Sequence, residues 1–186
     1  MGHVKVYPHP VELLSLFPTL ASLARIAAPP STMGLQGVDL TEAMRTGRPT
    51  SAGGVAAAAY SQITRCFNCS LAYRTDDTTY QKGCDKDSVD SGRFTVPCAL
   101  TPATRYDWMG MSVRTQRWRY TIWCKWRGSA LAADWSQCKL PELYNHTSDA
   151  SLFDVQTPAF FRNVAGEPAA ASTQSQLHAL LRKGFP

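Results

Sequence analysis

The sequence predicts an α+β domain, a small antiparallel β-sheet covered by a C-terminal α-helix. The first observation is MGMSVRTQRWRYTIW, residues 109–123, where alternation and aromatic residues predict a hairpin with strands at 109–114 and 118–126. The second is PAAASTQSQLHALLRKG, residues 168–184, whose leucines recur at helical spacing and which ends in Arg, Lys and Gly. An α-helix of this kind needs an apolar surface to cover, and the predicted sheet supplies one.

The N-terminal segment predicts two short helices. In VELLSLFPTLASLARIAAPP, residues 11–30, Pro18 fits the first turn of a second helix better than a helix interior. The apolar positions at helical spacing are Leu13, Leu16, Phe17, Leu20, Leu23, Ala24 and Ala27. This stripe is broad for so short a segment, so we expect it to need a partner surface. Residues 29–54 are rich in Gly, Pro, Ser and Thr and predict a connector with one helical candidate at 40–44.

Two further strands complete the predicted sheet. VAAAAYSQI, residues 55–63, predicts the first strand, and residues 142–145 predict a short last strand. Gln116 and Arg117 form the predicted hairpin turn. One strand face is expected to carry Trp118, Tyr120, Ile122 and Trp126, and the terminal helix to present Leu177, Leu180 and Leu181. The aromatic face is either a core packed under the terminal helix or an exposed binding platform.

Composition is that of one ordinary folded domain, with 44% hydrophobic and 18% charged residues among 186. No run of about 18 apolar residues occurs, so no membrane span is predicted. The net charge of +5 favours an anionic partner, although basic residues are spread along the chain, which also fits a solvated cationic surface. Aromatic and basic residues alternate over 117–127. No RNA-binding consensus accompanies them, so core packing is favoured over nucleic-acid binding.

Cysteines and glycosylation acceptors predict a glycoprotein of the secretory pathway, either lysosomal or extracellular. The cysteines are Cys66, Cys69, Cys84, Cys98, Cys124 and Cys138, and the N-x-[ST] acceptors are Asn68 and Asn145. The first 30 residues lack the basic and apolar regions of a signal peptide, so we expect an N-terminal part that this chain does not contain.

Disulfides are the favoured state of the six cysteines. The spacing over 66–98 matches a zinc ribbon only in its first half, and the acceptor beside Cys69 favours an oxidising compartment. We predict that Cys124 pairs with Cys138, because closing a loop of about 14 residues contributes on the order of 3 kcal/mol. The other four cysteines are expected to pair among themselves within the disulfide-rich loop 64–108.

No catalytic residue and no metal site is predicted in this chain. The acidic pairs Asp76–Asp77 and Asp85–Asp87 lack the glycine-centred spacing of a calcium loop, which favours solvated loop residues. The histidines, which share no metal-ligand spacing, are His3, His9, His146 and His178. No Ser or Cys lies in a nucleophile-elbow context.

Four segments together resemble the C-terminal part of the sulfatases, most closely the iduronate-2-sulfatase branch. They are VELLSLFPTLASLA (11–24), AYSQITR (59–65), MGMSVRTQRWRYTIW (109–123) and ELYNHTSD (142–149), in the order of that family. The chain departs from the usual family residues at Ile63, Thr64, Met111, Asn145 and Ala150. The resemblance implies an alkaline-phosphatase-like α/β parent fold, in which residues 1–28 end the large subdomain, 29–54 connect, and 55–186 form the C-terminal sheet subdomain.

The resemblance also implies a function. Sulfatases hydrolyse sulfate esters with a formylglycine made from C/S-x-P-x-R and a calcium ion, and none of the six cysteines here has that context. The expectation is a C-terminal fragment or light chain of a sulfuric ester hydrolase acting on sulfated glycans such as glycosaminoglycans. It would pack against an N-terminal sulfatase subdomain that holds calcium and formylglycine, wall the substrate cleft, and be inactive alone.

Three arginines could reach a sulfated sugar at the rim of that cleft: Arg65, Arg114 and Arg119. Structural salt bridges are the alternative role for each. Two other functions stay open for the whole chain. One is a secreted carbohydrate-binding module that uses the aromatic hairpin face for stacking, and the other is a docking module without catalysis. Solvent exposure of Trp118 and Tyr120 would distinguish these two functions from that of a sulfatase fragment.

Overall fold

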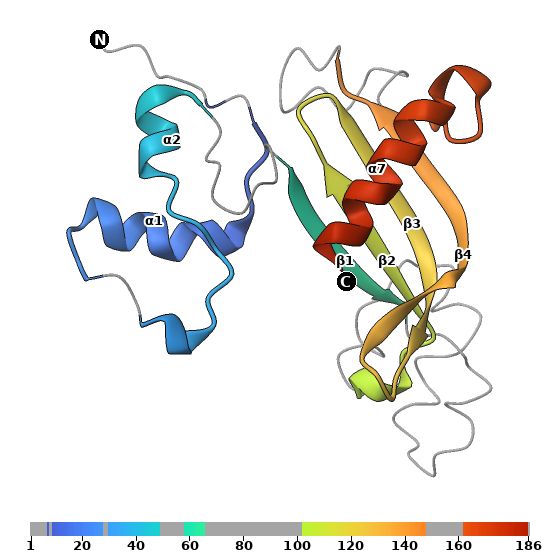
Figure 1. Ribbon diagram of the computed structural model, residues 1–186, viewed down its shortest axis with the longest axis horizontal. Coiled ribbons are helices and arrows are strands. Elements are labelled where there is room, and N and C mark those ends of the chain that lie inside the picture. The colour runs from blue at the N-terminus through green and yellow to red at the C-terminus, as the bar shows by residue number, and fades with distance from the viewer. Residues whose placement is uncertain are drawn as a thin grey trace, which may run out of the picture.

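A computed structural model describes residues 7, 9–27, 30–48, 58–65, 102–147 and 162–185. The elements, in chain order, are α1 (Leu16–Leu23), α2 (Thr41–Thr46), β1 (Ala59–Arg65), β2 (Trp108–Arg114), β3 (Trp118–Arg127), β4 (Ala132–Asn145) and α7 (Ala171–Gly184). Figure 1 shows a four-stranded sheet with α7 laid along it and the two short helices beside it. The predicted α+β class, with an antiparallel sheet and a C-terminal helix, is confirmed.

The sheet is an antiparallel meander with the order β1-β2-β3-β4. The predicted β2–β3 hairpin is confirmed, with Gln116 and Arg117 between its strands. Thr115 closes this turn, because its backbone N donates to the Trp118 carbonyl at 2.8 Å and its hydroxyl accepts from the Trp118 N at 3.1 Å. The turn fixes the register that pairs Val113 with Tyr120.

Two strands differ in length from the prediction. β1 begins at Ala59 and continues to Arg65, while residues 55–57 lie outside the described part of the chain. β4 spans 14 residues rather than the predicted 142–145. Its pairing with β3 is irregular, with register shifts opposite Thr121–Trp123 and Cys124–Lys125, and Leu140 has a positive φ of 54°. Such bulges break the two-residue alternation that would have revealed the strand.

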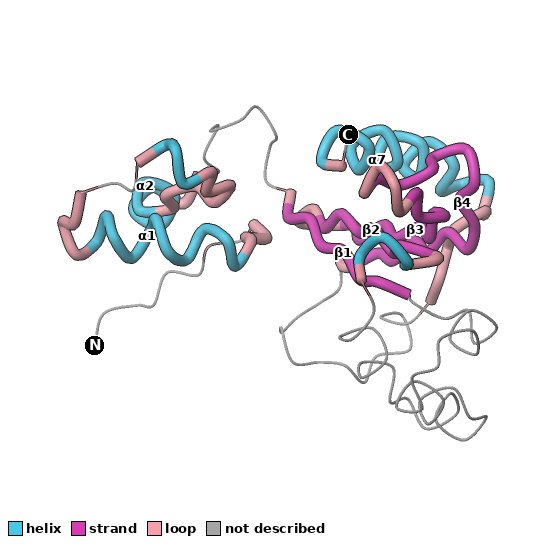
Figure 2. Tube along the Cα trace, turned by 90° about the horizontal axis from the view of Figure 1, so that it is seen from below, coloured by secondary structure: helices cyan, strands magenta, loops and turns pink. Residues whose placement is uncertain are grey.

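The hydrophobic core lies between α7 and one face of the sheet (Figure 2). Its buried residues include Met109, Met111, Val113, Tyr120, Ile122, Cys124, Leu143, Leu177 and Leu181. Tyr120 and Ile122 therefore pack under the terminal helix, as predicted. Trp118, Trp126 and Leu180 are only partly buried at the margin of this core, so Trp118 is less enclosed than the sequence predicted.

The N-terminal helices form one continuous element rather than two. A 3-10 turn at Leu13–Ser15 runs directly into α1, and Pro18 lies in the first turn of α1, where a missing N–H costs little. The polar side of this element is buried. The Ser15 hydroxyl accepts from the Val38 N at 3.2 Å, and the Thr19 hydroxyl accepts from the Leu40 N at 2.9 Å. These bonds fasten the predicted connector to α1.

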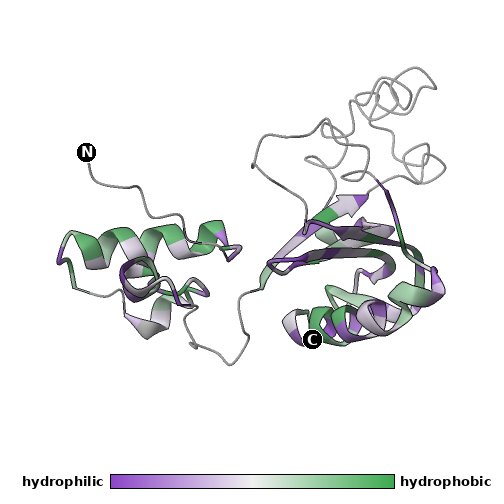
Figure 3. Ribbon diagram, turned by 90° about the horizontal axis from the view of Figure 1, so that it is seen from above, coloured by the Kyte–Doolittle hydropathy of each residue, from purple (hydrophilic) through white to green (hydrophobic). Residues whose placement is uncertain are grey.

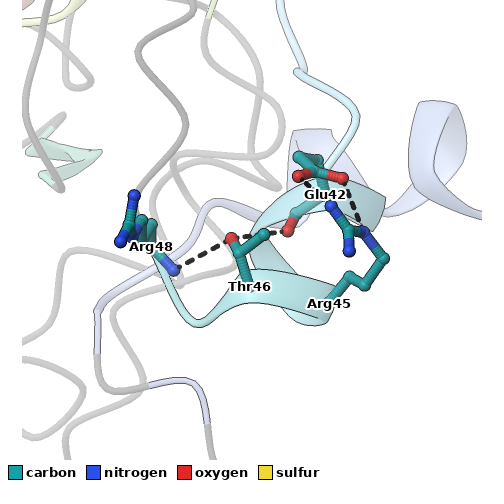
Figure 4. Close-up of polar contacts among 4 residues, drawn as sticks. All are labelled: Glu42, Arg45, Thr46 and Arg48. Carbon is teal, nitrogen blue, oxygen red and sulfur yellow. Dashed lines mark hydrogen bonds and ion pairs between the residues drawn. The ribbon is translucent and has the colours of Figure 1, made fainter.

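Helix α2 confirms the helical candidate within the connector. On its exposed surface Arg45 forms a two-bond ion pair with Glu42, with N···O distances of 2.6 and 2.9 Å. The Thr46 hydroxyl donates to the Glu42 carbonyl and accepts from the Arg48 N, which ends the helix (Figure 4). Gly47 follows with φ of 72°, a left-handed conformation that glycine adopts without strain.

Candidate functional site

The face of the sheet opposite α7 gathers cations and aromatic rings, and we call it the cation–aromatic face. Because side chains alternate along a strand, residues paired across strands share a face. The register aligns Arg65 with Trp108 and Lys125, aligns Arg114 with Arg119 and Tyr144, and aligns Trp123 with Lys139. The cations and aromatic residues of the cation–aromatic face are Arg65, Trp108, Arg114, Arg119, Trp123, Lys125, Lys139 and Tyr144. Helix α7 lies against the opposite side of the sheet (Figure 2).

Three cations on this face lie over aromatic rings. The Lys139 Nζ is 3.9 Å from the ring centroid of Trp108, and the Arg119 Cζ is 5.0 Å from that of Tyr144. The Arg65 Cζ lies 5.9 Å from the ring of Trp123. Such contacts are weak at exposed sites, about 0.5–1 kcal/mol each. They hold the cations in place without neutralising their charge.

Polar side chains occupy the middle of the same face. The Thr121 hydroxyl donates to the Ser112 hydroxyl at 2.9 Å, which in turn donates to the Tyr120 carbonyl at 3.2 Å. The Tyr144 hydroxyl donates to the Glu142 carboxylate at 3.0 Å. Burial and this bond to Glu142 raise the pKa of Tyr144, so its hydroxyl stays neutral and the ring carries no charge.

Carboxylates are fewer than cations on this face. Glu142 lies opposite Thr121 and Asp134 opposite Lys125. The Asp134 carboxylate is hydrogen-bonded within its own strand, because its Oδ1 accepts from the backbone N and the hydroxyl of Ser136. These bonds lower the pKa of Asp134. Beside Lys125, burial raises the pKa of Asp107, which the lysine partly offsets. Counted over the described residues alone, the cation–aromatic face carries more cations than carboxylates.

The structure brings together two of the three predicted rim arginines. Arg114 and Arg119 are directly opposite each other on β2 and β3, and both are half-buried. Arg65 lies at the far end of the face, opposite Trp108, roughly 20 Å along the strand at about 3.3 Å per residue.

Sequence reasoning missed the aromatic and lysine members of this face. Trp108 and Lys139 are distant in the sequence and meet only through the β2–β3–β4 register. Alternation alone would have placed Trp123 on the face opposite Tyr120. The face on which Lys139 lies could not be predicted, because the irregular pairing of β4 interrupts the two-residue alternation.

The disulfide prediction is confirmed for one pair. Cys124 and Cys138 form a disulfide between directly paired positions of β3 and β4. The cysteines at 66, 69, 84 and 98 and the acceptor Asn68 lie outside the described residues. The acceptor Asn145 ends β4, half-buried, and its Oδ1 accepts from the backbone N and the hydroxyl of Thr147 at 3.0 and 2.6 Å.

Within the described residues, no three His, Cys, Asp or Glu side chains group closely enough to hold a metal ion. The acidic pairs at 76–77 and 85–87 lie outside this part. No helix in the described ranges is both long and apolar enough to cross a membrane.

Comparisons with known proteins leave the family open. No protein-family model matches the chain, and no curated protein matches it significantly. The resemblance to sulfatases therefore remains a proposal that depends on the residues carrying it.

Proposed function

We propose that the chain is the C-terminal part, as a fragment or light chain, of a sulfuric ester hydrolase of the iduronate-2-sulfatase type. The observation that carries the proposal is the placement of the four sulfatase-like segments. They fall, in family order, on α1, β1, the β2–β3 hairpin and the end of β4, within a meander sheet covered by a terminal helix. In such an enzyme this subdomain packs against the large subdomain and walls the substrate cleft.

The apolar side of α1 supports a protein partner of the kind proposed. Figure 3 shows this helix as predominantly hydrophobic. The large apolar residues of α1 and of the 3-10 turn before it are exposed: Leu13 (89%), Leu14, Leu16, Phe17, Leu20 and Leu23. A contiguous exposed apolar patch marks an interaction surface. The segment is also tied to the sheet, since the Tyr60 N donates to the Glu12 Oε1 at 2.7 Å, so a partner bound there would lie beside β1.

The proposed chemistry assigns binding to this chain and catalysis to its partner. Hydrolysis of a sulfate ester needs a nucleophile and a preorganised charge to stabilise the transition state. Formylglycine and calcium would supply both from the N-terminal subdomain. Cations of this chain can attract the sulfated glycan, but binding substrate and transition state equally gives no acceleration. A disulfide between β3 and β4 supports a secretory location, lysosomal or extracellular.

The proposal is tested first at the gene and then by complex formation. The genomic sequence upstream of the Met1 codon is expected to encode C/S-x-P-x-R in frame. The upstream-encoded polypeptide, co-expressed with the 186-residue chain, should copurify with it. Phe17→Glu with Leu20→Glu on α1 should abolish copurification, whereas Leu131→Glu with Leu140→Glu, exposed apolar positions near and within β4, should not. An upstream sequence without the motif would overturn the proposal.

A second candidate function rests on a separate observation. The rings of Trp108, Trp123 and Tyr144 are half-exposed on one face, as a secreted carbohydrate-binding module would require. In that case the isolated chain would be monomeric and bind neutral glycans without any partner. Trp118 and Tyr120, the residues first expected to form such a platform, lie instead on the side covered by α7.

A further inference from the structure

We propose that Asn145 carries an N-linked glycan whose first sugar packs against the exposed part of Trp118. The acceptor is Asn145-His146-Thr147, an N-x-[ST] sequence of the kind that oligosaccharide transfer requires. The proposal takes from the proposed function only the secretory location of the chain. The place of the sugar is inferred from the residues where β3 begins and β4 ends.

The pairing of β3 with β4 sets Asn145 beside Trp118. The two residues are cross-strand partners, so their side chains lie on one face of the sheet. The His146 N donates to the Arg117 carbonyl at 2.7 Å, and because this bond flanks the pair, Trp118 and Asn145 form a non-hydrogen-bonded pair. Side chains are closest in such pairs, with Cβ atoms about 4.5–5.5 Å apart. A group attached to the Asn145 side chain therefore starts next to the indole ring.

This pair forms the margin of the core. One row further in, Tyr120 and Leu143 are cross-strand partners and are only 1% and 0% exposed. Trp118 packs against the same core but is partly exposed, as is Asn145. The exposed Arg117 lies over the Trp118 ring, with its Cζ 5.3 Å from the ring centroid, and a cation–π contact at an exposed site is weak. The core thus leaves apolar ring surface that a sugar can cover.

The Asn145 amide is oriented for the attachment. Its Oδ1 accepts from the backbone N and from the hydroxyl of Thr147, at 3.0 and 2.6 Å. A backbone N–H is a donor only, so the amide oxygen must face Thr147 and the Nδ2 must face away from it. The sugar bonds to Nδ2, so its attachment leaves both hydrogen bonds of Oδ1 in place.

The modification is a group transfer from a lipid-linked oligosaccharide diphosphate, catalysed by the transferase of the secretory pathway. The Asn145 Nδ2 forms a bond to the anomeric carbon of the first N-acetylglucosamine, and the bond from that carbon to the phosphate oxygen breaks. The lipid diphosphate leaves with the electron pair, and one Nδ2 proton passes to the transferase. When β4 then pairs with β3, the apolar C–H face of the sugar meets Trp118 and removes ring surface from water.

Occupancy of Asn145 is the first measurement. The full 186-residue chain is secreted, with an added leader, from eukaryotic cells that build high-mannose glycans. Asn68→Gln is present throughout, so that Asn145 is the one remaining N-x-[ST] acceptor in the sequence. Peptide mass spectrometry should find Asn145 glycosylated, and Thr147→Ala should abolish the modification. A folded, secreted chain with unmodified Asn145 would overturn the proposal.

Two enzymatic treatments then locate the sugar that contributes stability. An endoglycosidase that leaves one N-acetylglucosamine should leave the melting temperature unchanged. Complete removal by a glycan amidase should lower it by roughly 2–4 °C. The amidase converts Asn145 to aspartate, so Asn145→Gln, which never carries a glycan, is the control for the new charge and should melt equally low. A fall already at the endoglycosidase step, or no fall after complete removal, would contradict packing of the first sugar.

The partner ring is tested by matched tryptophan variants. Complete removal of the glycan should no longer lower the melting temperature of Trp118→Ala but should still lower that of Trp126→Ala, whose ring is partly buried near the other end of β3. An equal fall in both variants would show that the sugar does not act through Trp118.

Hydrogen exchange decides the matter if Trp118→Ala does not fold. In the parent chain the His146 amide, which donates to the Arg117 carbonyl, should exchange more slowly with the first sugar than without it, and equal exchange would overturn the proposal. No sulfate ester and no upstream sequence enters these measurements. A failure here therefore leaves the upstream-motif and copurification tests of the proposed function intact.

Discussion

The Tyr120 hydroxyl and the His178 Nδ1 meet at 3.2 Å where α7 lies against β3. The contact lies at the edge of the core, since Tyr120 is 1% exposed and His178 is partly exposed. Trp135 from β4 packs edge-on against the same imidazole, with ring centroids 5.7 Å apart, and Arg182 of α7 lies over Trp135. The histidine thus joins three elements and couples the docking of α7 to its own protonation.

Lowering the pH is expected to destabilise the fold through His178. Burial, and then the nearby charge of Arg182, lower the pKa of His178 below its usual 6.5, so the folded chain disfavours the protonated ring. The unfolded chain binds the proton more readily, and stability therefore falls as the pH drops below about 6.5. Melting temperatures measured between pH 7.5 and 5 should decrease in the parent chain and decrease less in His178→Gln. Identical slopes in both would contradict this role.

Alkaline conditions test the other partner of the same contact. Burial raises the pKa of Tyr120 to about 12, whereas a tyrosine in the unfolded chain ionises near pH 10. A raised folded pKa contributes stability that is present below about pH 10 and is lost as pH rises toward the folded value. Melting temperatures should fall above pH 10, and Tyr120→Phe should reduce that fall. The control is Tyr106→Phe, at a partly buried position outside the strands.

Truncating aromatic residues of β3 should cost more stability in the core than at its margin. Tyr120→Ala is expected to cost roughly 3–5 kcal/mol, the range for a buried aromatic residue. Tyr120→Phe removes only the hydroxyl and should cost about 0.5–1.5 kcal/mol. Trp118→Ala should cost less than Tyr120→Ala, because Trp118 is only partly buried. Urea unfolding measures all three, and a cost for Trp118→Ala above that for Tyr120→Ala would place the core elsewhere.

The disulfide between β3 and β4 should stabilise the sheet mainly through the unfolded chain. Its loop has a sequence separation of 14, for which loop entropy gives about 3 kcal/mol. Cys124→Ala with Cys138→Ala should lower the denaturation midpoint accordingly. Peptide mapping without reduction should recover the Cys124–Cys138 link in the parent chain. A link from Cys124 to any cysteine of 66–98 would contradict the structure.

Local pattern determined which elements could be predicted. The hairpin was predictable because strict alternation flanks Gln116–Arg117, and α7 because Leu177 and Leu181 share a helical face. Most of β4 was not predictable, because its irregular pairing removes the alternation. Leu140, with its positive φ, lies in this strand. Alternation also predicted Tyr120 as core but could not tell that Trp118 lies at its margin, because alternation gives the face on which a residue lies and not its depth of burial.

The candidate site was predictable only in part, for a related reason. Arg114 and Arg119 flank one turn, so their pairing follows from hairpin geometry. Lys139 of β4 reaches Trp108 of β2 across β3, and that contact depends on a register set by an irregular β4. No short-range pattern contains this information. The sequence therefore predicts the hairpin end of the site, whereas the contact of Lys139 with Trp108 at its other end is seen only in the structure.

Sulfate-ester turnover is the most direct test of the central claim, that this chain is the non-catalytic C-terminal part of a sulfatase. A fluorogenic sulfate ester with calcium is offered to the 186-residue chain alone, and to the chain co-expressed with the upstream-encoded region and a formylglycine-generating enzyme. The account predicts no turnover above a heat-killed control for the chain alone, and turnover for the pair that is lost when the Cys or Ser of C/S-x-P-x-R becomes Ala. Turnover by the isolated chain, or none by the assembled pair, would contradict it.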